Sequence, residues 1–120
     1  MKVAVDLDNT IDATPKEMQS LMTALMAAGH VVVVLTGTAE DVVTQEVWND
    51  KNQYLNTLGC STCWNQLTVI ASPDGSGSDA KAKWCDEHGV DILIDNSKEN
   101  ARAATAAGVP LVLVPWASRS

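Results

Sequence analysis

Two aspartates end the first apolar run of the chain, in the stretch VAVDLDNT at residues 3–10. Asp6 and Asp8 are two residues apart, so on a continuous strand both side chains would point to the same face. A third aspartate, Asp95, ends a later apolar run in the same way. A buried carboxylate needs a compensating partner, and carboxylate oxygens are the ligands that Mg²⁺ prefers. The sequence therefore predicts a magnesium site formed by Asp6, Asp8 and Asp95.

Short runs rich in Val, Ile and Leu alternate with helical patterns along the whole chain. The runs predict five strands, at residues 2–7, 31–35, 67–71, 91–94 and 111–114. Four helices are expected between them, at residues 14–29, 39–58, 78–88 and 97–107, the first opened by a capping box of Thr14 and Glu17 and the second irregular near residues 49–52. This alternation predicts an α/β fold, a three-layer α/β/α sandwich around a five-stranded, mostly parallel Rossmann-like sheet. We expect one domain over residues 1–120.

The net charge and the cysteine content exclude some classes of function. The chain has 8 basic and 15 acidic residues and a formal charge of -7, which disfavours stable binding to a long duplex and suits a small ligand or a cation. Its three cysteines do not form a disulfide framework, and Cys60 and Cys63 lack the second half of a zinc site. With neither a leader segment nor a membrane-spanning run expected, the sequence favours a cytoplasmic protein that does not contact a membrane.

Four motifs lie where predicted strands and helices end, in the order DLDNT, LTG, Lys81 in KAKWCDEHG, and LIDN. In this order they resemble the motifs of the haloacid dehalogenase superfamily of phosphohydrolases. The resemblance spans essentially the whole chain and implies the same α/β fold. It also implies a magnesium-dependent phosphatase that hydrolyses a phosphomonoester through an aspartyl phosphate.

The resemblance assigns roles to individual residues. It implies that Asp6 is the nucleophile and that Asp8 is the general acid and base. Phosphate would be held by Asp6, Thr36, Gly37 and Lys81, with Lys83 as the alternative lysine. Magnesium would be held by Asp6, Asp95 and the main-chain carbonyl of Asp8. The family often has a second acid where this chain has Asn96, and Glu99 is placed to take that supporting role.

Family members often carry a cap domain, and the chain has no segment long enough to hold one after its first or third predicted strand. Among capless relatives it looks most similar to the phosphatase domain of polynucleotide kinases, which implies a nucleotide or a nucleic-acid end as substrate. Thr38 departs from that domain, which places an arginine after the glycine. Trp64 is the aromatic residue that could stack on a base. The sequence leaves an oligomeric assembly open.

Two other functions stay open from the sequence alone. A phosphate-receiving signalling domain has a similar length and five-stranded topology, although its acceptor aspartate after the third strand is missing here, where Ala71 and Ser72 stand. The second is a haloacid dehalogenase-like domain that has lost its activity because Asn96 replaces the second acid.

Overall fold

Five strands form a single, fully parallel sheet in a computed structural model of the chain, which describes residues 1–75 and 77–115. The strands are β1 (Lys2–Val5), β2 (Val31–Thr38), β3 (Gln66–Ala71), β4 (Ile92–Ile94) and β5 (Leu111–Leu113). They lie in the order β3-β2-β1-β4-β5, so β1 is central and pairs with both β2 and β4. All five expected strands are present, and the predicted fold class is confirmed.

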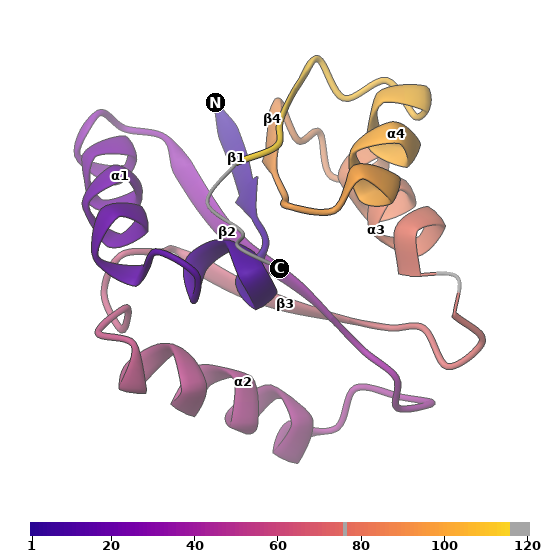
Figure 1. Cartoon of the computed structure of the whole chain (residues 1–120), viewed down its shortest axis with the longest axis horizontal. Coiled ribbons are helices and arrows are strands. Elements are labelled where there is room, and N and C mark those ends of the chain that lie inside the picture. Colours follow the sequence, from indigo (N-terminus) through magenta and orange to yellow (C-terminus); the bar gives the residue numbers. More distant parts are fainter. Residues whose placement is uncertain (76, 116–120) are drawn as a thin grey trace.

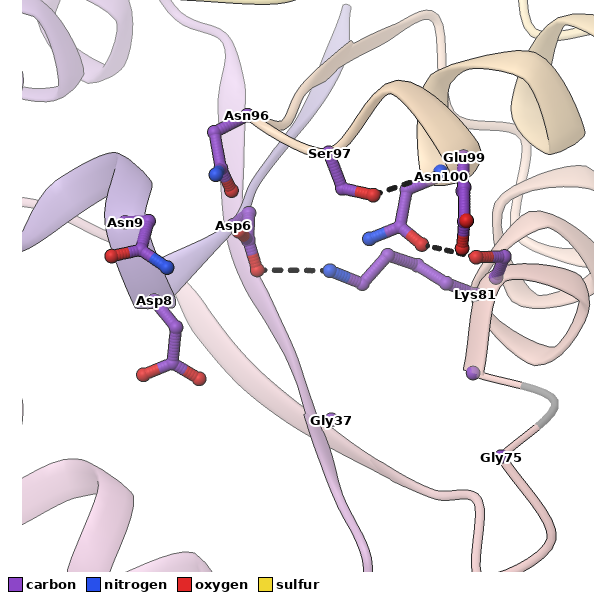
Figure 2. A pocket seen from close by; sticks show the side chains of 12 residues that line it. Asp6, Asp8, Asn9, Gly37, Gly75, Lys81, Asn96, Ser97, Glu99 and Asn100 are labelled. Atoms are coloured by element: carbon purple, nitrogen blue, oxygen red, sulfur yellow. Dashed lines mark hydrogen bonds and ion pairs between the residues drawn. The ribbon is translucent and has the colours of Figure 1, made fainter. Parts of the chain in front are cut away.

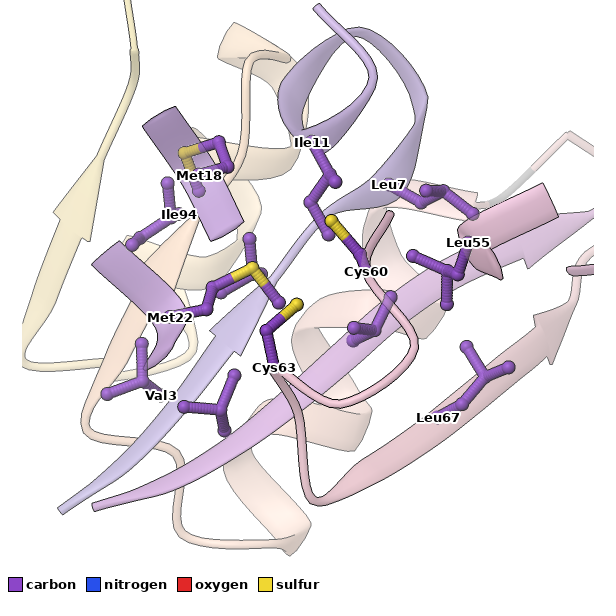
Figure 3. Close-up of a cluster of buried hydrophobic side chains, with 13 residues drawn as sticks. Val3, Leu7, Ile11, Met18, Met22, Leu55, Cys60, Cys63, Leu67 and Ile94 are labelled. Carbon is purple, nitrogen blue, oxygen red and sulfur yellow. The ribbon is translucent and has the colours of Figure 1, made fainter. Parts of the chain in front are cut away.

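Four helices cover the two faces of this sheet (Figure 1). Helices α1 (Pro15–Ala27) and α2 (Gln45–Thr57) lie on one face, and α3 (Gly77–Glu87) and α4 (Lys98–Ala106) lie on the other. Alternation along β1 explains the division, because Val3 and Val5 pack in the core under α1 and α2, whereas Ala4 packs in the core under α3 and α4. The larger core, which includes Met22 and Leu55, is shown in Figure 3. The three-layer sandwich follows from this two-sided burial.

The chain departs from the predicted first strand immediately after Val5. Asp6 is still extended, with φ −69° and ψ 150°, but residues Leu7–Ile11 form a short irregular helical turn, η1. Within η1 the backbone of Asn9 is left-handed, at φ 61°, a conformation that asparagine tolerates better than most residues. The strand therefore ends before Asp8, and the alternation that would align Asp6 with Asp8 is lost.

Two helix details also differ from expectation. Helix α2 begins at Gln45 rather than near residue 39 and runs unbroken through residues 49–52. Its start is fixed by Thr44, whose side chain accepts a hydrogen bond from the backbone N–H of Val47. At α1, by contrast, the Thr14 side chain makes no capping hydrogen bond, so the predicted capping box does not form.

Within the described residues, no helix has the length and apolar composition needed to cross a membrane.

Candidate functional site

A buried lysine joins the ends of two neighbouring strands. Lys81 Nζ, on α3, lies 2.9 Å from Asp6 Oδ1 (Figure 2). It also lies 2.9 Å from Asp95 Oδ2. The three residues are 5%, 6% and 0% exposed, respectively. Because β1 and β4 are adjacent and parallel, both aspartates arrive at the same edge of the sheet, and α3 brings the lysine to them. The structure thus brings together three of the predicted site residues, and the cation that compensates the buried carboxylates is a lysine of the chain.

The N-terminal end of α4 also holds Asp95. Asp95 Oδ1 accepts a hydrogen bond from the backbone N–H of Ser97 at 2.9 Å, and Asp95 Oδ2 accepts one from Asn100 Nδ2 at 2.9 Å. Asn100 Oδ1 in turn accepts a hydrogen bond from Ser78 Oγ on α3, at 2.7 Å. Glu99 is the supporting residue that the sequence predicts, but Asn100 makes this contact. A spacing of five residues after Asp95, in the first turn of a helix, is the signal that could have identified it.

Thr10 is a second residue of the site that the sequence patterns do not predict. Its hydroxyl donates to Asp6 Oδ2 at 3.1 Å and accepts a hydrogen bond from the backbone N–H of Asn96 at 3.1 Å. Thr10 belongs to η1 and is 1% exposed. The turn after β1 therefore fixes the carboxylate of Asp6 and ties it to the end of β4.

Asp8 does not join the buried cluster. Its side chain is 57% exposed, and its ionic partner is Lys51 Nζ on α2, at 3.9 Å. Figure 2 shows the Asp8 carboxylate directed away from the Lys81 amine. Among the residues that the structure describes, no group of three His, Cys, Asp or Glu side chains is arranged to hold a metal ion. The predicted magnesium ligands Asp6 and Asp8 nevertheless both line one cavity, while Asp95 is buried behind it.

Burial and neighbouring charges shift the titration of this cluster. Burial raises the pKa of Asp6 to about 6; Lys81 opposes that rise and the nearby Asp95 adds to it. Burial lowers the pKa of Lys81, but the attraction of Asp6 and Asp95 outweighs it, so the pKa of Lys81 stands above its ordinary value. Lys81 is therefore charged at neutral pH and is held between two carboxylates.

Thr36 and Gly37 lie near the end of β2, and of the two only Gly37 is among the residues that line the cavity. Thr36 is fully buried, and its hydroxyl has no hydrogen-bond partner in the described part of the chain. An unpaired buried hydroxyl is unfavourable and is often found where a ligand binds. Gly37, the next residue, lines the cavity. Lys83, the alternative lysine, is 78% exposed and pairs with Glu87 at 3.8 Å, so α3 directs Lys81 and not Lys83 to the site.

The cavity has a volume of about 400 Å³ and lies at the carboxyl edge of the sheet, which is where ligands bind in folds of this kind. It is lined by Asp6, Asp8, Asn9, Ser78, Lys81, Asn96, Ser97, Glu99 and Asn100, together with Gly37, Gly75 and Gly77. A lysine ammonium has three N–H donors, and Lys81 uses two of them on Asp6 and Asp95. Within the part of the chain that the structure describes, the third donor has no partner.

No protein-family model and no curated protein sequence matches the chain. Solved structures do match. A universal stress protein from Archaeoglobus fulgidus is 12% identical, with a TM-score of 0.61, over 96% of this chain and 93% of that one. The universal stress protein from Archaeoglobus fulgidus in complex with dAMP is 10% identical, with a TM-score of 0.63, over 96% and 98% of the two chains. A universal stress protein in complex with cAMP is 17% identical, with a TM-score of 0.57, over 95% of each chain.

These likenesses establish a shared fold and correct the family prediction. The predicted membership of the haloacid dehalogenase superfamily is wrong, because the solved structures described above, which share this architecture over nearly their whole length, are universal stress proteins. The prediction of a magnesium-dependent phosphatase with an aspartyl-phosphate intermediate is wrong for the same reason. The roles of Asp6 as nucleophile and of Asp8 as general acid and base lose their basis. The comparisons support neither the signalling domain nor the inactive phosphatase-like domain.

Proposed function

We propose that the chain binds a small phosphorylated molecule, a nucleoside monophosphate among them, in the cavity at the carboxyl edge of the sheet. The observation that carries this proposal is the position of Lys81, which lines the cavity and, among the described residues, uses two of its three N–H donors, on Asp6 and Asp95. Two of the structures with this fold are complexes with dAMP and cAMP. Those ligands belong to the proteins that bind them, and they supply the first compounds to test.

Charge balance makes a divalent cation part of the proposal. Two of the cavity-lining residues, Asp6 and Asp8, are aspartates, and a phosphate dianion would meet both of them. Mg²⁺ would offset this repulsion, because it binds through one or two carboxylates and completes its shell with water and phosphate oxygens. The Asp8 carboxylate is exposed and only loosely paired with Lys51, so it is accessible to an ion. Asp6 and Asp8 are therefore the proposed magnesium ligands, with Asp95 fixing Lys81 behind them.

The hydroxyl of Thr36 and the backbone of Gly37 are the remaining proposed phosphate contacts. Thr36 supplies a buried donor without a partner in the described residues, and the absence of a side chain at Gly37 leaves the adjacent backbone open to the cavity. Asn96 remains a predicted supporting residue. Its backbone N–H donates to the hydroxyl of Thr10, which in turn donates to Asp6.

Isothermal titration calorimetry with AMP, dAMP and cAMP tests the proposal, in excess Mg²⁺ and in excess EDTA. We expect AMP to bind in Mg²⁺ and its affinity to fall by at least about tenfold in EDTA. Lys81→Met should abolish binding, and Lys83→Met, two residues along the same helix, is the matched control that should not. Because Lys81→Met removes a buried charge, Asp8→Asn provides a second variant at an exposed position. Equal AMP binding by wild type and Asp8→Asn would disprove the magnesium part, and absence of binding to all three compounds would disprove the function.

A further inference from the structure

The cavity differs from ordinary nucleotide pockets in the chemistry of its wall. Each lining residue is a glycine or carries a polar or charged side chain. Small-molecule pockets are usually lined mainly by apolar and aromatic side chains, with a few polar groups that fix orientation. A base is normally held by stacking against an aromatic or apolar surface. The described wall offers no such surface.

Two tryptophans that could have stacked on a base are committed to the interior. Trp48, on α2, packs against the larger core and donates its indole N–H to the backbone oxygen of Leu67 at 3.0 Å. Trp64 packs against the same core and donates to the backbone oxygen of Cys60 at 2.7 Å. Neither lines the cavity, so the suggestion that Trp64 forms a base-stacking wall is not supported by its position.

The chain has four Trp, one Tyr and no Phe, and the two others that the structure describes, Trp84 and Tyr54, also lie away from the cavity. Trp84 stacks on His88, one turn further along and at the carboxyl end of α3, with ring centroids 4.1 Å apart. The hydroxyl of Tyr54 donates to Asp12 Oδ2 at 2.8 Å, and the ring does not line the cavity. Trp116 lies outside the described residues.

Hydroxyl-binding groups take the place of an aromatic wall. Glu99 and Asn9 line the cavity from α4 and η1, and neither side chain hydrogen-bonds to another described residue. Both are exposed and free to turn toward a ligand. A carboxylate accepts hydrogen bonds from hydroxyls, and an amide both donates and accepts them. Such groups suit a sugar or polyol, whose recognition depends on hydrogen bonds.

We infer that the cavity recognises the phosphate and the attached sugar or polyol and is indifferent to the base. This inference rests on the proposed function and specifies its ligand class as phosphorylated sugars and polyols, with nucleotides bound through their phosphoribose part. The phosphate lies near Lys81, and the hydroxyls lie toward Glu99 and Asn9. The base extends out of the cavity and contributes little to affinity.

Calorimetric titrations in fixed salt and magnesium separate these contributions. The probes are AMP, GMP, CMP, UMP, ribose 5-phosphate, inorganic phosphate and adenosine. The four nucleotides and ribose 5-phosphate should bind within about threefold of one another, inorganic phosphate about tenfold more weakly, and adenosine not at all. Glu99→Gln should weaken ribose 5-phosphate by about threefold to tenfold relative to inorganic phosphate, because the change in charge affects both phosphates alike and cancels in the ratio. Glu87→Gln, an exposed change at the far end of α3, is the matched control.

The outcomes distinguish this inference from the proposed function. Binding of adenosine, or a preference above about tenfold for one base, would overturn base indifference while leaving phosphate binding intact. Equal affinity for inorganic phosphate and ribose 5-phosphate would overturn sugar recognition alone. A base preference that disappears in Trp116→Ala would overturn the inference and assign stacking to Trp116. Absence of binding to every phosphorylated probe would overturn both proposals.

Discussion

Lys81 Nζ and Asp6 Oδ1 are 2.9 Å apart although their residues are 75 positions apart in the chain. Asp95 Oδ2 lies at the same distance from the amine. One ammonium therefore serves two carboxylates that water hardly reaches, and this arrangement joins β1, β4 and α3 at the proposed binding site. Removing one partner of such a group leaves an uncompensated buried charge.

Replacing Lys81 should destabilise the protein strongly. Lys81→Met would leave Asp6 and Asp95 facing each other without a cation, so the free energy of unfolding should fall by about 3–5 kcal/mol. Lys83→Met, on the same helix, removes only an exposed pair and should change it by less than about 0.5 kcal/mol. Urea denaturation of both variants at pH 7 measures the difference. Equal stability of the two variants would mean that the buried pair does not stabilise the fold.

Stability should fall as the pH rises through the titration of Asp6. The pKa of Asp6 is raised from 3.8 to about 6 in the folded chain, so the folded state binds this proton more tightly than the unfolded state does. Asp6 therefore contributes stability that is fully present below about pH 4 and is lost by about pH 6, with an upper limit of about 3 kcal/mol.

Scanning calorimetry of wild type and Asp6→Asn between pH 4 and pH 7, in EDTA, isolates this contribution from that of the other acids. As the pH rises from 4 to 7, the wild type should lose stability relative to Asp6→Asn. A constant difference would show that the pKa of Asp6 is not raised.

The parts of the site that could be predicted from sequence are those fixed by sheet topology. Parallel strands end at one edge, so placing Asp6 and Asp95 at strand ends was enough to bring them together. The position of Lys81 near the start of its helix was likewise sufficient to direct it to that edge.

Contacts that depend on local backbone geometry could not be predicted in this way. The strand stops at Val5, and the left-handed backbone of Asn9 bends η1. Asp8 therefore lies outside the buried cluster, where strand alternation had predicted it to be. Asn100 and Thr10 reach Asp95 and Asp6 through side-chain placement within a helix and a turn, which periodicity does not specify. The family also could not be settled from four short motifs, because polar residues at strand ends are common to many folds of this architecture.

The cysteines should be unreactive in the folded protein. Burial raises the pKa of Cys63 to about 12, with Cys60 adding to the shift, and burial raises the pKa of Cys85 to about 11. All three thiols are free and buried. An exposed thiol reacts with an aromatic disulfide reagent within minutes at pH 8, and we expect none of the three to react in that time in the folded protein. In guanidinium all three should react at once. Rapid labelling of the folded protein would place at least one thiol at the surface.

The unpaired hydroxyl of Thr36 predicts opposite effects on stability and on binding. Thr36 is fully buried, and its Oγ1 finds no partner among the described residues. Thr36→Val keeps the shape of the side chain and removes the unmet hydroxyl, so the free energy of unfolding should rise by about 1 kcal/mol. The affinity for AMP in magnesium should fall by about tenfold, because the proposed ligand would supply the partner that the hydroxyl lacks.

Thr38→Val is the matched control for Thr36→Val, two residues further along β2. Thr38 is partly exposed, and its hydroxyl accepts a hydrogen bond from the backbone N–H of Glu40 at 3.3 Å. This variant should lose a little stability and bind AMP as wild type does. Urea denaturation and calorimetry on the same samples test both parts. A loss of stability in Thr36→Val would show that the hydroxyl is already satisfied in the free protein. A gain in stability without any loss of affinity would remove Thr36 from the binding site, because a hydroxyl that contacts the ligand cannot be deleted without weakening it.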